Sequence, residues 1–129
     1  MNARDPDCRD VIMPYRGFIH HGDDPYFYYD GFVFYCPGCE SVHSFITRYD
    51  DPKPPDPRDA SKYPLWTFNG DLVKPTFAPS LLYPRLQIEG KTVCCHSFVI
   101  NGEIRYERDS THALAGKTVP LSRDNFLFK

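Results

Sequence analysis

The stretch "YFYYDGFVFYCPGCESVHSFITRY", Tyr26–Tyr49, indicates the fold class. Its first part, Tyr26–Cys36, is rich in aromatic and β-branched residues, which favour extended strands that pair. The segment Val42–Tyr49 alternates apolar and polar residues and is predicted to be the return strand. Together the two segments predict a β-hairpin whose tip carries Cys36 and Cys39.

The second half of the chain is predicted to add an antiparallel meander. Leu81–Asp109 divides into three strands, because Glu89-Gly90 and Asn101-Gly102 are turn signals. A further short strand is expected over Leu65–Asp71, which contains the Asn69-Gly70 turn.

One short helix is expected over Asp109–Gly116. Asp109 or Ser110 would be its N-cap, and Gly116 would end it. Lys117–Leu121 is expected to add an edge strand.

The chain of 129 residues fits a single domain. Residues 1–25 are polar and broken by prolines, so we expect a loose N-terminal arm with one short strand near Val11–Met13. Residues 26–129 are expected to form one β domain, with a proline-rich loop at 50–64.

Charge and hydropathy exclude several classes of protein. The net charge is −2, and no basic stripe is present, so nucleic acid is not expected as a partner. The sequence contains no apolar stretch long enough for a transmembrane helix and does not begin like a signal peptide. We therefore expect a cytoplasmic protein without a membrane partner.

The C-x2-C pair, Cys36 and Cys39, is typical of one half of a zinc site, because its Pro-Gly corner lets both sulfurs converge. The run Cys94–His96 and the nearby His43 offer the other half. A redox C-x-x-C pair usually precedes a helix in a βαβ unit, whereas this pair lies between two expected strands. A set dominated by cysteines favours a closed, structural zinc site over a catalytic one.

Strand alternation leaves two ligand sets open. Successive side chains of a strand point to opposite faces, so Cys94 and His96 share one face while Cys95 and Ser97 share the other. Either Cys94 with His96, or Cys95 with His43, completes the site.

A series of motifs then occurs in a fixed order: "GFVFYCPGC…H", "WTFNGD", "KPTFAPSLL", "CHSFVINGEIRY" and "DSTHALAGKTVPL". Over Gly31–Leu121 the chain resembles a family of small phage and prophage zinc-binding proteins of unassigned function, often mislabelled ammonia monooxygenase. That family is related to BubE, the peptidase-like component of bacterial ubiquitin-like (Bub) operons. The resemblance implies structural Zn²⁺ held by Cys36, Cys39, His43 and Cys95. The sequence pattern itself predicts the fold class, which is mostly β: a small antiparallel β-meander or sheet with a zinc-knuckle hairpin and one short helix.

The resemblance also implies a serine peptidase. The Pro79-Ser80 step matches the family's "P-S" motif, which makes Ser80 the candidate nucleophile. A serine needs a histidine base within hydrogen-bond reach and a group that orients that base. His96 is the first candidate base, because it lies on the face of its strand opposite Cys95. There is no G-x-S-x-G motif, which argues against an α/β-hydrolase.

His112 is the second candidate base, with Asp109 near enough in sequence to orient it. Ser97 and Ser110 are rival nucleophiles. For His96, the roles of zinc ligand and packed core histidine stay open as well.

The sequence thus predicts a zinc-stabilised serine hydrolase of phage or prophage origin that cleaves a ubiquitin-like protein or its conjugates. One alternative is a non-enzymatic zinc-binding module that binds a host or phage protein, and another is a metal-dependent hydrolase. Wide separation of Ser80 from His96 would favour the binding module.

Overall fold

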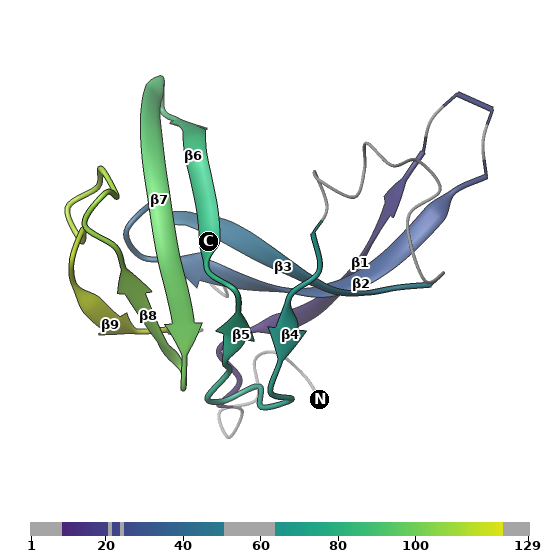
Figure 1. The fold of residues 1–129 in the computed structure, drawn as a ribbon, viewed down its shortest axis with the longest axis horizontal. Coiled ribbons are helices and arrows are strands. Elements are labelled where there is room, and N and C mark those ends of the chain that lie inside the picture. Colours follow the sequence, from purple (N-terminus) through teal and green to yellow (C-terminus); the bar gives the residue numbers. More distant parts are fainter. Residues whose placement is uncertain (1–8, 21, 24, 51–63, 123–129) are drawn as a thin grey trace.

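The computed structural model describes residues 9–20, 22–23, 25–50 and 64–122. These residues form nine strands and no helix (Figure 1). In chain order the strands are β1 (Met13–Ile19), β2 (Phe27–Cys36), β3 (Ser41–Tyr49), β4 (Thr67–Phe68), β5 (Phe77–Ala78), β6 (Leu81–Ile88), β7 (Lys91–Ile100), β8 (Glu103–Tyr106) and β9 (Thr118–Pro120). They make three sheets, ordered β1-β2-β3, β4-β5 and β6-β7-β8-β9, with antiparallel pairing throughout. The predicted fold class, mostly β and antiparallel, is therefore confirmed.

The predicted hairpin is formed by β2 and β3. Cys36 lies opposite Ser41 and Phe34 lies opposite His43, so the cysteine knuckle occupies the turn between the strands. Glu40 closes this turn with a φ of 52°, in the left-handed region. The hairpin thus brings two thiols and an imidazole to one end of the sheet.

The strand β1 lies in the segment expected to be a loose arm. It pairs with β2 along its whole length, from Met13 opposite Val33 to Ile19 opposite Phe27. The strand expected near Val11–Met13 is therefore longer and begins later, and residues 13–19 belong to the sheet. A proline within β1 is compatible with this role, because β1 is an edge strand.

The meander β6-β7-β8 turns at the two predicted positions. Glu89 and Gly90 both have positive φ, as do Asn101 and Gly102, which is the geometry of two-residue hairpin turns. The expected edge strand is β9, which pairs with β8.

The prediction of a short helix over Asp109–Gly116 is wrong. These residues form turns, with bonds between residues three apart such as the one from the N–H of Ala115 to the carbonyl of His112 (3.2 Å). Ser110, expected as a cap, instead bonds through its hydroxyl to the backbone of His96. An isolated helix of eight residues has only marginal stability, so the bonds from Ser110 to β7 determine the conformation of this segment.

Aromatic side chains join the sheets into a core. Phe45 of β3 stacks on Phe77 of β5 with ring centroids 4.1 Å apart, and Phe77 stacks on Phe68 of β4 at 4.8 Å. Phe34 and Trp66 pack against other sides of Phe45. This stack fixes the β4-β5 ribbon, and with it the segment entering β6, against the β2–β3 hairpin.

Residues 1–8 of the expected arm and residues 51–63 of the expected proline-rich loop lie outside the described part of the chain. Within that part, no helix has the length and apolar character needed to cross a membrane.

Candidate active site and metal centre

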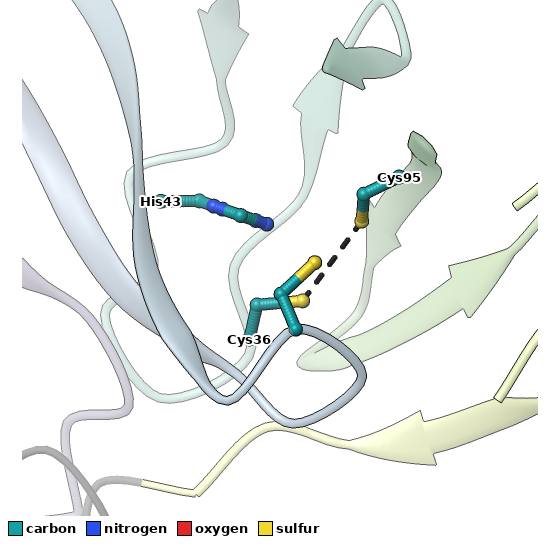
Figure 2. A group of neighbouring side chains, drawn as sticks. Cys36, His43 and Cys95 are labelled. Carbon is teal, nitrogen blue, oxygen red and sulfur yellow. Dashed lines mark hydrogen bonds between the residues drawn. The ribbon is translucent and has the colours of Figure 1, made fainter. Parts of the chain in front are cut away.

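Four buried side chains converge where the tip of the β2–β3 hairpin meets β7: Cys36, Cys39, His43 and Cys95. Their potential ligand atoms all lie within 4.8 Å of one another. Figure 2 shows that Cys36, His43 and Cys95 point toward one position from three directions. The sulfurs of Cys36 and Cys95 are 3.9 Å apart, close to the edge of about 3.8 Å expected for a tetrahedron with Zn–S bonds of about 2.3 Å. The group can hold a metal ion.

The surroundings of His43 and the three cysteines are also compatible with a bound cation. Nε2 of His43 is buried and has no hydrogen-bond partner among the described residues, an arrangement that is costly unless another group binds the atom. The cysteines are free thiols. Hydrogen bonds from Cys39 and Cys95 lower the pKa of Cys36, while bonding to Cys36 raises the pKa of Cys39 to about 12 and raises that of Cys95. A thiolate among buried thiols is stabilised by a nearby positive charge.

The other ligand pair suggested by the sequence, Cys94 with His96, points to the opposite face of β7. Neither side chain belongs to the buried group, and Nε2 of His96 lies 3.1 Å from Oγ of Ser80. Of the two sets left open by strand alternation, the one with Cys95 and His43 is therefore the set that can hold a metal.

Tyr106 supports the cysteine knuckle from β8. Its hydroxyl oxygen accepts the N–H of Gly38 at 3.0 Å, which leaves its proton to donate to Sγ of Cys36 at 3.1 Å. Burial raises the pKa of Tyr106, and the charge on Cys36 adds to the effect, so the phenol keeps this proton. No local signal in the sequence points to this contact, because Tyr106 lies far along the chain from the knuckle.

His112, the second candidate base, packs behind the knuckle. Its ring lies edge-on to Tyr106 with centroids 4.4 Å apart, and a Cβ at Gly38 would come within 2.4 Å of the same ring. Burial lowers the pKa of His112, and its Nε2 has no hydrogen-bond partner among the described residues. These contacts place His112 beside the knuckle that carries Cys36 and Cys39.

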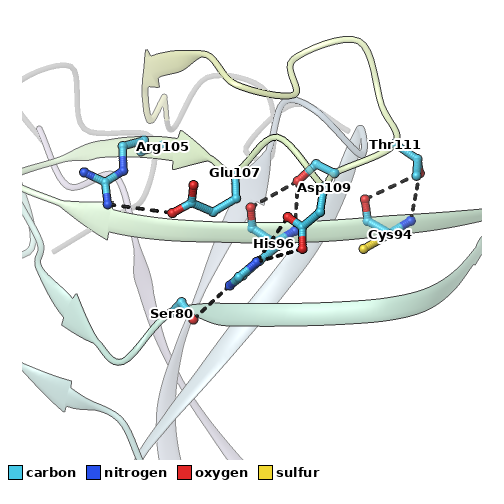
Figure 3. Close-up of polar contacts among 8 residues, drawn as sticks. Ser80, Cys94, His96, Arg105, Glu107, Asp109 and Thr111 are labelled. Carbon is cyan, nitrogen blue, oxygen red and sulfur yellow. Dashed lines mark hydrogen bonds and ion pairs between the residues drawn. The ribbon is translucent and has the colours of Figure 1, made fainter.

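Three polar side chains form a chain of hydrogen bonds on the solvent side of β7 (Figure 3). Oγ of Ser80 lies 3.1 Å from Nε2 of His96. Nδ1 of the same ring lies 3.2 Å from each carboxylate oxygen of Asp109. Asp109, expected beside His112, thus contacts His96 instead. The arrangement is that of a nucleophile, a base and a group that orients the base.

The backbone of His96 is fixed from the side of β8. Its N–H donates to Oγ of Ser110 at 3.0 Å, and the hydroxyl of Ser110 donates back to the carbonyl of His96 at 3.1 Å. The same carbonyl accepts the N–H of Glu107 at 2.8 Å. The N–H of Cys94 donates to Oγ1 of Thr111 at 2.9 Å, and the carbonyl of Cys94 accepts the backbone N–H of Thr111 at 2.9 Å. The segment that carries Asp109 is therefore attached to β7 at two outward-facing residues, which holds the carboxylate next to the imidazole.

Ser80 lies immediately before β6, after a cis peptide bond between Ala78 and Pro79. Its carbonyl accepts the indole N–H of Trp66 at 3.3 Å. Ser80 also lines a groove of about 550 Å³ between β6 and the β1-β2-β3 sheet, with Tyr15 and Tyr83 among its walls. Ser80 thus borders the groove while its carbonyl is held by Trp66.

The rival serines have different surroundings. Ser97 is fully buried at 0% exposure, and its hydroxyl has no hydrogen-bond partner in the described part of the chain. Ser110 is also buried and uses its hydroxyl on the backbone of His96. Neither contacts a histidine ring in the way Ser80 does.

A family model covers most of the chain. The model described as bacterial ubiquitination-like system serine protease (BubE) matches residues 12–107, and the chain belongs to that family. The matched range includes the four potential metal ligands as well as Ser80 and His96. Comparisons with curated proteins and with solved structures found no match.

Proposed function

We propose that this BubE-family chain is a zinc-stabilised serine peptidase with Ser80 as nucleophile, His96 as general base and Asp109 as the group that orients the base. The observation that carries the proposal is the continuous set of contacts from Asp109 through both nitrogens of His96 to Oγ of Ser80. The ubiquitination-like system named by the family implies a protein substrate, and we assign a ubiquitin-like protein or its conjugates to that role.

The chemistry follows from the order of these contacts. Oγ of Ser80 attacks the scissile carbonyl carbon, and its proton passes to Nε2 of His96. Asp109 accepts the hydrogen bond from Nδ1 and stabilises the imidazolium. His96 then gives the proton to the leaving amine as the carbon–nitrogen bond breaks, which leaves an acyl group on Ser80. Water activated by His96 hydrolyses this ester and restores the serine.

The metal group has a different role in this proposal. Cys36, Cys39, His43 and Cys95 would hold Zn²⁺, which is commonly bound by three cysteines and one histidine in closed structural sites. Bound there, the ion would join the hairpin tip to β7 and thereby stabilise the strand that carries His96 on its other face. All four residues are buried, as expected for a structural site.

Labelling with a small fluorophosphonate tests the nucleophile. Ser80→Ala should abolish labelling while the zinc-to-protein ratio stays that of the wild type. Ser97→Ala is the matched control, since Ser97 is buried and lies on the opposite face of β7 from His96; it should keep the labelling. Undiminished labelling of the Ser80 variant would remove Ser80 as the nucleophile.

The separation of 3.1 Å between Ser80 and His96 favours the peptidase over the non-enzymatic binding module. The metal-dependent hydrolase is less favoured because the potential ligands are buried and offer three thiols. Phage origin and a cytoplasmic location stay predictions from the sequence.

A further inference from the structure

The strand β6 is an edge strand whose outer side adjoins the groove at Ser80. In the sheet order β6-β7-β8-β9, its only strand partner among the described residues is β7. Leu81, Leu82 and Tyr83 line the groove together with Ser80. An edge strand presents backbone N–H and C=O groups that another extended segment can pair with.

The hydrogen-bond pattern of β7 identifies which residue of β6 presents these groups. The N–H and C=O of His96 bond toward Ser110 and Glu107, on the β8 side of β7. Leu82 lies opposite His96 in the antiparallel ladder. Because paired residues of such a ladder direct their backbone groups in the same sense, inward or outward, the N–H and C=O of Leu82 point away from β7.

Two neighbouring residues agree with this assignment. The carbonyl of Ser80, two residues before Leu82, accepts the indole N–H of Trp66 from the outer side. Pro84, two residues after Leu82, has no N–H to offer and lies at the register shift between Tyr83 and Leu86 on this edge strand, both of which are places where proline is tolerated. Leu82 itself has no backbone hydrogen bond on this side from the described residues. The accessible edge is therefore short and centred on Leu82.

The position of the base decides which part of a substrate occupies this edge. His96 must deliver a proton to the leaving group, and it lies on β7, so the leaving group lies on the β7 side of Ser80. The acyl part of the substrate must then lie on the other side of Ser80, along the outer edge of β6, where the groove lies. None of the described residues that line the groove carries a formal charge, and aromatic rings such as Tyr15, Tyr29 and Trp66 form much of its wall.

We infer that the acyl side of the substrate binds as an added strand on β6, with one of its residues exchanging two backbone hydrogen bonds with Leu82. The segment that enters is an extended, uncharged stretch of polypeptide. This inference rests on the proposed function, because Ser80 fixes the point where the added strand must end. The main-chain bonds give affinity without regard to sequence. The uncharged lining formed by the described residues disfavours charged side chains, because burying a charge without a partner is costly.

The test uses tetra-alanine diphenyl phosphonates, which carry only the acyl side and label a reactive serine. One probe is unmodified, and the others each carry a methyl group on one backbone nitrogen. Methylation of a nitrogen that faces β6 should slow labelling of the wild-type protein by about fivefold or more, the value of one net hydrogen bond. Methylation of the adjacent nitrogen should change the rate far less. The effect should therefore alternate along the probe.

Two variants connect this alternation to Leu82. Leu82→Pro removes the outward N–H and should lower the rate of the unmodified peptide probe relative to a small fluorophosphonate by about fivefold. Leu82→Ala keeps the N–H and should retain the alternation. Probes with aspartate or lysine in place of an alanine should both react more slowly than the parent.

If every methyl group slows labelling equally, or if no methyl group slows it, the inference is overturned while Ser80 remains the nucleophile. The wild-type methyl scan gives this answer even if Leu82→Pro does not fold. Absence of labelling by the small fluorophosphonate would instead overturn the proposed function, and the inference with it.

Discussion

Replacing Asp109 by asparagine tests whether the contact to His96 orients a working base. In the proposed mechanism the carboxylate of Asp109 stabilises the imidazolium that forms when Ser80 loses its proton, and a neutral amide at this position would not do so by charge. The amide can also donate its N–H to Nδ1, which would hold the proton on Nε2, the atom that must accept the proton of Ser80. Asp109→Asn should therefore slow fluorophosphonate labelling.

The size of the effect follows from the geometry and exposure of the pair. At 3.2 Å, two unit charges interact by about 1 kcal/mol at the dielectric constant of water and by about 5 kcal/mol at an effective dielectric of 20. The side chain of Asp109 is 62% exposed and that of His96 is 26% exposed, which places the pair toward the weaker limit. A charge-assisted hydrogen bond contributes about 1.5–3 kcal/mol, so we expect a loss of roughly 10- to 100-fold in rate. This is less than the loss of about 10⁴-fold for a buried serine protease triad.

The assay is the second-order rate of labelling of Ser80, followed by intact-protein mass spectrometry. Asp109→Ala separates the two effects, because alanine removes the charge without donating to Nδ1. Glu103→Gln is the matched control, since it removes one negative charge at an exposed position of β8 and should keep the wild-type rate. Added salt should narrow the gap between wild type and Asp109→Asn, because exposed charges are screened. Wild-type rates in Asp109→Asn and Asp109→Ala would refute the role assigned to Asp109.

Three further predictions concern the supporting structure. Cys95→Ser should lower zinc affinity by more than about 100-fold, since loss of a residue that only hydrogen-bonds to a metal ligand already costs about 10- to 100-fold. Cys94→Ser should retain the zinc content, and equal loss of zinc in both variants would contradict the ligand assignment. Ser110→Ala removes both hydroxyl bonds to the backbone of His96 and should lower the free energy of unfolding in urea by about 1–3 kcal/mol, with slower labelling; an unchanged midpoint would count against the stabilising role of these bonds. The pKa of Asp30 lies below its ordinary value of 3.8 because Arg16 donates a hydrogen bond to it, so its stabilising effect is present above pH 3.8 and is lost as the pH falls through its folded pKa. Asp30→Asn should therefore flatten the acid limb of a stability–pH profile, and an unaltered limb would exclude this contribution.

The hairpin and the meander could be predicted because their signals are local. Aromatic and β-branched runs mark the strands, and the pairs Glu89-Gly90 and Asn101-Gly102 supply the positive φ that their turns require. The four potential metal ligands could also be predicted in part, because strand alternation places Cys95 and His96 on opposite faces of β7. Choosing between the two ligand sets required the family resemblance.

The features that sequence reasoning missed depend on contacts between distant segments. The helix expected at Asp109 had reasonable capping residues, yet the hydroxyl of Ser110 bonds to β7 instead of capping a helix. The strand β1 was obscured by its proline and glycine, and only its pairing with β2 defines it. The contact of Asp109 with His96 follows from the path of the chain after β8, which no local pattern specifies.

The four potential metal ligands and the proposed catalytic residues share one strand, β7, so the proposed zinc site would also affect the proposed catalysis. Cys95 and His96 are adjacent, so the backbone that directs Cys95 into the buried group directs His96 outward toward Ser80. A shift of β7 by one residue would exchange the two faces and remove both sites at once. The buried group holds β7 from the hairpin side, and Ser110 holds it from the β8 side. These two attachments together position His96 relative to Ser80, so we expect that weakening either one would misplace the proposed base.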